Sequence, residues 1–117
     1  MNKFIRRRII RSEEKGPIVN TYHYTRSVTA YTGGRDNLID FNFKIGASYT
    51  FVLAFSGGYT YLRLLIGTTA IEQKYTNPAT ISFDYTTSLG SRFNAFIWKP
   101  AANGTLTVDI TETIPRT

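Results

Sequence analysis

From residue 17 onward the chain alternates apolar and polar residues over about a hundred positions, and this period of two constrains the fold more than any other feature. Successive side chains of a β-strand point to opposite faces of a sheet, so the alternation predicts strands with one buried and one solvated face. Clusters of Gly, Pro and Asn separate the alternating runs. Such residues favour turns, so the pattern predicts an all-β domain.

We expect about eight or nine short strands. The first run, residues 18–31, predicts one long strand or two strands bent near Arg26, and residues 32–37 form a turn cluster. The later runs are residues 38–45, 49–55, 59–66, 69–75, 81–85, 93–98 and 105–111. Short strands at this spacing, separated by turn signals, are typical of an antiparallel sandwich or barrel.

The chain divides at Gly16-Pro17 into an N-terminal arm, residues 1–16, and a β-domain, residues 17–117. The first fifteen residues hold six Lys/Arg against two Glu, so they carry +4 of the formal net charge of +6. A short basic and apolar arm on a compact domain is typical of a device for docking or assembly.

Composition excludes several classes of protein. The 42% hydrophobic content over 117 residues predicts one domain with a real core rather than a disordered chain. Without Cys the chain has neither disulfides nor thiolate metal sites. Arg6-Arg7-Arg8 interrupts the apolar N-terminal stretch, so we expect no signal peptide. No apolar run approaches the roughly 18 residues of a membrane span.

Three stretches carry a resemblance to a known family: Gly-Ala-Ser-Tyr-Thr-Phe at 46–51, Tyr-Leu-Arg-Leu at 61–64 and Gly-Thr-Leu-Thr-Val-Asp-Ile at 104–110. They resemble the jelly-roll β-sandwich of carbohydrate-binding modules, over about two-thirds of the chain. Similar jelly rolls occur in phage virion proteins, as capsid decoration and fibre modules. The resemblance implies a jelly-roll-like antiparallel sandwich, a place in a virion assembled in the host cytoplasm, or a glycan ligand.

That family often holds a structural Ca²⁺ between an acidic residue of an early strand and the Asp of the final strand. Asp109 matches the second position, but residues 18–31 contain no carboxylate. Ca²⁺ requires several oxygen ligands. We therefore expect no metal site.

Catalytic chemistry has little to build on. The single His, His23, lies on the polar side of a predicted strand, and the absence of Cys and of a second His excludes the usual triads and transition-metal clusters. A pair of carboxylates would have to converge, and their spacing does not predict it; the candidates are Asp36, Asp40, Glu72, Asp84, Asp109 and Glu112. No phosphate loop or dinucleotide fingerprint is present. We expect no enzyme activity and no cofactor.

Exposed aromatic residues could stack on sugar rings or form contacts between subunits, where aromatic residues are enriched. Trp98 falls out of phase with its apolar neighbours Ala95 and Ile97, which predicts a side chain outside the main core. Filling a second core face is the alternative role for these residues. The candidates are Tyr59, Tyr61, Tyr75, Tyr85 and Trp98.

The arm interleaves large apolar side chains with arginines; the residues are Phe4, Ile5, Arg6, Arg7, Arg8, Ile9, Ile10 and Arg11. It could form an amphipathic helix, with Ile5 and Ile9 one turn apart, or add as a strand to a neighbour. The arginines could instead neutralise phosphates. Burying four large apolar residues favours a protein partner.

These observations predict a non-enzymatic structural protein, anchored by its arm to other subunits of a large assembly such as a phage capsid or tail. A carbohydrate-binding module is the first alternative. The second is a nucleic-acid-binding β-domain, which would need stacking aromatics beside basic residues on one strand face.

Overall fold

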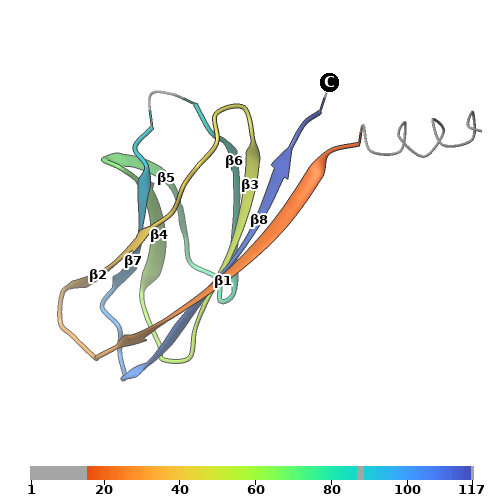
Figure 1. Ribbon diagram of the computed structural model, residues 1–117. Coiled ribbons are helices and arrows are strands. Elements are labelled where there is room, and N and C mark those ends of the chain that lie inside the picture. Colours follow the sequence, from red (N-terminus) through yellow and green to blue (C-terminus); the bar gives the residue numbers. More distant parts are fainter. Residues whose placement is uncertain (1–15, 87–88, 117) are drawn as a thin grey trace, which may run out of the picture.

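The computed structural model describes residues 16–86 and 89–116, and within them the chain forms eight β-strands and no helix (Figure 1). The arm residues 4–11 lie outside the described part of the chain. The strands are β1 (Ile18–Val28), β2 (Gly34–Asp40), β3 (Ser48–Phe55), β4 (Tyr61–Ile66), β5 (Thr69–Lys74), β6 (Ala79–Asp84), β7 (Arg92–Trp98) and β8 (Gly104–Ile114). No described helix has the length and apolar character of a membrane span.

The strands form two four-stranded antiparallel sheets, β1-β8-β3-β6 and β2-β7-β4-β5. Their pairing is nested: the first strand pairs with the eighth, the second with the seventh, the third with the sixth and the fourth with the fifth. This order is that of a jelly roll, a long hairpin folded over into two sheets. The predicted all-β, jelly-roll-like sandwich is confirmed.

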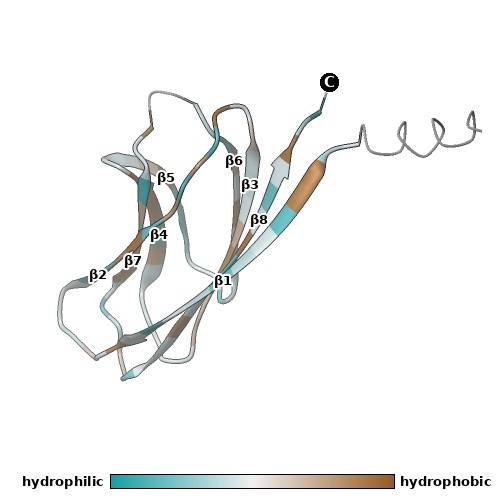
Figure 2. Cartoon of the chain, in the orientation of Figure 1, coloured by the Kyte–Doolittle hydropathy of each residue, from teal (hydrophilic) through white to brown (hydrophobic). Residues whose placement is uncertain are grey.

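The two sheets face each other (Figure 1). The core lies between them and is built from alternate residues of every inner strand. Apolar segments accordingly recur along the strands of both sheets (Figure 2). β3 and β8 supply one side of the core and β4 and β7 the other, which is what a period of two requires. The fully buried residues include Phe51, Leu53, Leu62, Leu64, Ile66, Ile81, Phe93, Ile97, Leu106 and Val108.

The structure corrects two boundaries of the sequence reading. β1 is one strand that ends at Val28, with Ala30 exposed beyond it. The strand predicted at 38–45 is instead β2, which starts inside the predicted turn at Gly34 and ends at Asp40. Alternation continues past Asp40 because Phe41 is buried and Phe43 packs on the core while the chain crosses from one sheet to the other. A period of two in the sequence indicates that alternate side chains are buried. A segment can show this alternation without pairing to another strand.

Candidate functional site

Aromatic side chains form a connected group on the outer face of the β2-β7-β4-β5 sheet. The rings of Tyr61 and Trp98, which are paired across β4 and β7, have centroids 5.8 Å apart and planes 13° apart. Phe96 lies 6.1 Å from Trp98, and Tyr75 lies 6.0 Å from Tyr61. We call Tyr61, Tyr75, Phe96 and Trp98 the aromatic face.

The strand period and one glycine position this aromatic face. Phe96 and Trp98 alternate with the fully buried Ile97, so they must point away from the core. Gly34 on β2 pairs with Trp98. A Cβ atom on Gly34 would lie 1.9 Å from Cζ of Phe96, so this ring occupies the space that a larger residue would need. The glycine thus lets the ring lie close against the backbone of the edge strand.

Cations border the aromatic face. The Arg63 guanidinium carbon lies 4.9 Å from the centroid of the Phe96 ring, and Nζ of Lys99 lies 5.8 Å from that of Trp98. Both distances are within the range of a cation–π contact. Nε of Arg63 is buried and has no hydrogen-bond partner among the described residues.

Two carboxylates on the same sheet face nearly balance the positive charge. Asn94 donates a hydrogen bond to Asp36 at 2.7 Å, and Arg92 forms an ion pair with Asp40 at 2.5 Å. The face therefore holds three cations, Arg63, Arg92 and Lys99, against the two carboxylates of Asp36 and Asp40. Mixed polar groups around stacked rings suit a protein surface or a neutral sugar better than a polyphosphate, which needs a clear excess of positive charge.

The structure groups three of the five aromatic residues predicted as ligand or interface residues and separates the other two. Tyr61, Tyr75 and Trp98 lie on the aromatic face, and Tyr75 is 69% exposed. Tyr85 is buried in the core, and its hydroxyl donates to the carbonyl of Gly90 at 2.9 Å.

Tyr59, the fifth aromatic candidate, packs on the edge of the core. Its hydroxyl donates to the carbonyl of Thr76, and burial raises the pKa of the phenol. The sequence reading missed Phe96 as a member of the aromatic face, although its parity with Trp98 along β7 was the signal that could have found it.

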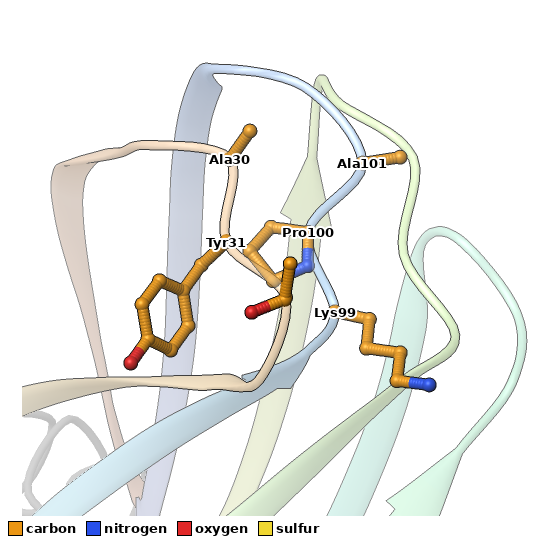
Figure 3. A pocket seen from close by; sticks show the side chains of 6 residues that line it. Ala30, Tyr31, Lys99, Pro100 and Ala101 are labelled. Atoms are coloured by element: carbon orange, nitrogen blue, oxygen red, sulfur yellow. The ribbon is translucent and has the colours of Figure 1, made fainter.

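A pocket of about 570 Å³ lies at one end of the sandwich, where the β1–β2 and β7–β8 connections meet (Figure 3). Tyr31 N–H donates to the Pro100 carbonyl at 3.1 Å, and Lys99 N–H donates to the Gly33 carbonyl at 2.8 Å. The Arg35 guanidinium carbon lies 4.1 Å from the centroid of the Tyr31 ring. Figure 3 shows the side chains of Tyr31 and Lys99 extending in different directions from Pro100, so the two polar groups do not converge on one point.

The carboxylate of Glu112 is fully buried between β8, β1 and β3. It accepts hydrogen bonds from Tyr49 Oη at 2.6 Å, Asn20 Nδ2 at 2.9 Å and Tyr22 Oη at 3.2 Å, and Nζ of Lys44 lies 3.6 Å away. Burial alone would raise the pKa of this carboxyl, but the three hydrogen bonds and the Lys44 charge outweigh it and lower the pKa.

Burial and the hydrogen bond to Glu112 raise the pKa of Tyr49, so this hydroxyl keeps its proton and donates it. The hydroxyl in turn accepts a hydrogen bond from the backbone N–H of Lys44 at 2.8 Å. Both carboxylate oxygens of Glu112 and the Tyr49 hydroxyl therefore have hydrogen-bond partners, which is the pattern of a structural network that ties β1 to β8 and β3.

The remaining carboxylates and the histidine of the described residues do not converge. His23 and Asp109 pair across β1 and β8 at 2.5 Å on the solvent side, with both side chains more than half exposed. Asp84 accepts a hydrogen bond from Ser48 at 2.8 Å, and Glu72 pairs with Lys74 at 2.7 Å. Within residues 16–86 and 89–116, no group of three metal-ligating side chains is present.

No family model matches the chain, and no curated protein matches it in sequence. A chain of the cyanophage Pam1 capsid asymmetric unit is similar in structure. It is 15% identical, the match covers 86% of this chain and 87% of that chain, and the TM-score is 0.52. A chain of the Bacillus endospore appendages, a family of disulfide-linked pili, is 14% identical over 86% of this chain and 91% of that one, with a TM-score of 0.48. The likeness to the capsid chain concerns the fold alone.

Proposed function

We propose that this chain is a structural, non-enzymatic component of a phage virion, of the capsid-decoration or fibre type, and that its arm and its aromatic face contact neighbouring subunits. The aromatic face is the observation that carries the proposal. The outer face of an antiparallel sandwich sheet is normally polar. Here the outer face of the β2-β7-β4-β5 sheet carries four aromatic side chains instead.

Aromatic and Arg side chains dominate the energetic centres of protein interfaces. Tyr61, Trp98 and Arg63 combine these residue types on one face. The jelly roll supports the same reading, because a chain of a cyanophage capsid asymmetric unit has a similar fold. The arm adds a second contact: four large apolar residues interleaved with arginines favour burial against a protein.

The test is incorporation into particles. Tagged full-length chain made during infection should band with the particles in a density gradient. Deleting residues 1–15 should remove the chain from the particle band and leave it folded in the soluble fraction, as measured by circular dichroism. Thr80→Ala, at an exposed residue of the β6 edge, is the matched control and should band like the unmodified chain. Absence of the full-length chain from the particle band would show that the proposal is wrong.

Two narrower variants separate burial from charge in the arm. Ile5→Ser with Ile9→Ser should weaken incorporation strongly, since burial of each Ile contributes about 1.5–3 kcal/mol before ordering costs. Replacing Arg6, Arg7 and Arg8 with Gln should weaken it mainly at low salt. The opposite ranking, together with release of the chain by nuclease, would identify nucleic acid as the partner of the arm.

Glycan binding is a second candidate function, and the aromatic face also favours it. The amide-bearing residues Asn94 and Gln73 lie on the same strands or the neighbouring strand of this sheet, at positions whose parity places them on the face of the stacked Tyr61 and Trp98 rings. Trp98 is the only Trp, so its fluorescence reports on this surface directly.

Titration with neutral oligosaccharides such as maltohexaose tests this second function. It should shift Trp98 emission in the unmodified chain and fail to do so in Tyr61→Ala. If neutral oligosaccharides leave the emission unchanged while Tyr61→Ala reduces incorporation into particles, the aromatic face is a subunit contact.

A further inference from the structure

We infer that the free edge of β1 pairs with β1 of a second copy of this chain, antiparallel and about a two-fold axis at His23. This self-association goes beyond the proposed virion role, because it assigns a partner to a surface that neither the arm nor the aromatic face includes. β1 is the outer strand of the β1-β8-β3-β6 sheet, and one of its sides has no strand neighbour in the described chain (Figure 1).

β1 is the longest edge of the sandwich and is regular throughout. Its eleven residues pair with β8 from Ile18↔Ile114 to Val28↔Gly104 without a shift of register. Apart from the Arg26 guanidinium, which donates to the Thr25 carbonyl at 2.8 Å, no described hydrogen bond reaches the β1 backbone from outside the β1–β8 pair. Apart from the Thr25 carbonyl, the second edge of β1 is therefore a row of backbone groups without protein partners among residues 16–86 and 89–116.

The other three edges carry features that oppose pairing. Natural proteins protect sheet edges with short strands, charges, proline or bulges. β6 has six residues and follows Pro78 directly, β5 has six residues with a register shift and the Glu72–Lys74 ion pair, and β2 has seven residues with charges at Asp36 and Asp40. β1 has no Pro, Gly, Lys or carboxylate. Of the four edges, β1 alone is suited to accept another strand.

The sequence of β1 is complementary to itself in this orientation. Directly opposed residues of an antiparallel pair share a face. Because β1 has an odd number of residues, full overlap places residue 18 opposite residue 28 and keeps inner residues opposite inner residues. The sheet then continues from one copy into the next with the same two faces.

No uncompensated like charges meet in this register. Arg26, the one Arg or Lys of β1, falls opposite Asn20, and Thr21 falls opposite Thr25. Tyr22 falls opposite Tyr24, an aromatic cross-strand pair that favours association. His23 falls opposite its own copy, and each His23 has the Asp109 carboxylate of its own chain 2.5 Å away. Isologous pairing of this kind closes at two copies.

Charge placed at Thr21 and Thr25 tests both the contact and its register, because the two exposed residues face each other across the axis. We expect full-length chain to dimerise in analytical ultracentrifugation with a dissociation constant between about 1 μM and 1 mM, as befits a small interface. Thr21→Lys with Thr25→Lys opposes like charges twice and should weaken the dimer at least about tenfold. Thr21→Lys with Thr25→Glu opposes unlike charges and should restore it.

A matched control and a cross-link complete the experiment. Thr80→Lys with Ser82→Lys adds the same charge to exposed residues of the β6 edge and should leave dimerisation unchanged. The chain has no Cys, so His23→Cys gives a single thiol on the proposed axis, which copper–phenanthroline should oxidise to a disulfide-linked dimer. Ser27→Cys, whose two copies would lie far apart, should stay unlinked.

Several results would overturn the inference. One is a full-length chain that remains monomeric up to about 1 mM. A second is a Lys/Glu variant that dissociates as much as the Lys/Lys variant while circular dichroism shows both to be folded. A third is dissociation caused by the β6 control. A fourth is formation of the disulfide-linked dimer by Ser27→Cys and not by His23→Cys, which would exclude the proposed two-fold register.

Discussion

Replacing Glu112 with Gln preserves the size of a fully buried side chain and removes its charge, so it isolates what the carboxylate contributes. Oε1 accepts hydrogen bonds from Asn20 and Tyr22, and Oε2 accepts one from Tyr49. A Gln amide retains one oxygen. Its NH₂ group must lie where an acceptor now lies, so one of these donors would face another donor.

The expected cost follows from these contacts. A hydrogen bond to a charged group contributes about 1.5–3 kcal/mol to stability, against about 0.5–1.5 kcal/mol for a neutral one. Three such bonds become neutral or are lost, while the substitution relieves the cost of burying a charge. We expect the free energy of unfolding at pH 7 to fall by about 2–3 kcal/mol, a large share of the roughly 5–15 kcal/mol available to a domain.

Acid should remove this difference. The hydrogen bonds hold the pKa of Glu112 in the folded chain below its ordinary value of 4.5. A carboxyl with a depressed folded pKa contributes stability that is present above the unfolded pKa and is lost as pH falls through the folded value. The stability gap between the unmodified chain and Glu112→Gln should therefore be constant above about pH 5 and narrow below it.

Urea unfolding followed by Trp98 fluorescence at several pH values measures the gap. Glu72→Gln is the matched control, because Glu72 pairs with Lys74 on the surface of β5 at 2.7 Å. Such exposed pairs contribute about 0–1 kcal/mol, so this variant should unfold like the unmodified chain. An equal loss for Glu112→Gln at pH 7 and pH 3, or no loss at either pH, would refute the reasoning.

Three further predictions concern the β-domain. The fragment 17–117 should fold alone and melt cooperatively, because the described core draws on no residue before Ile18; a fragment without β-type circular dichroism would contradict this. His23→Ala should leave stability within about 1 kcal/mol and leave particle incorporation unchanged, since the His23–Asp109 pair is exposed; a folded variant that loses its role would reveal a missed site. Gly34→Ala should destabilise the domain by about 1–3 kcal/mol in urea unfolding, because the new Cβ would displace the Phe96 ring, and an unchanged midpoint would show that the ring moves at no cost.

The sequence predicted most strands to within a few residues, including the edge strands β5 and β6. β3, β4, β7 and β8 were found within a few residues, since their inner faces are continuous apolar sets. The prediction was least accurate at residues 34–45, where a turn cluster became part of β2 and an expected strand became a crossing segment. Hydrogen-bond partners decide such boundaries, and these partners come from distant β7.

The candidate site was predicted in part. Parity along β7 identified Trp98 as lying outside the core, and Tyr61 and Tyr75 were named with it, but their meeting on one face depends on the pairing of β4 with β7 and β5. Tyr85 is an aromatic residue like the others and was predicted with them, but its side chain is buried. Alternation assigns a side chain to one of two faces, and the fold decides which face water reaches.

The sequence alone therefore determined the all-β class, because that class depends on local period and turn residues. The choice of a sandwich over a barrel rested on the resemblance to jelly-roll modules, and the division at Gly16-Pro17 stays a prediction. Only the tertiary structure decided that Glu112 is buried with Tyr49 and Asn20, which lie 63 and 92 residues away along the chain. The same holds for the free edge of β1 and for the connected aromatic face. Each depends on which distant strands become neighbours, and that choice minimises the free energy of the whole sandwich rather than of any one segment.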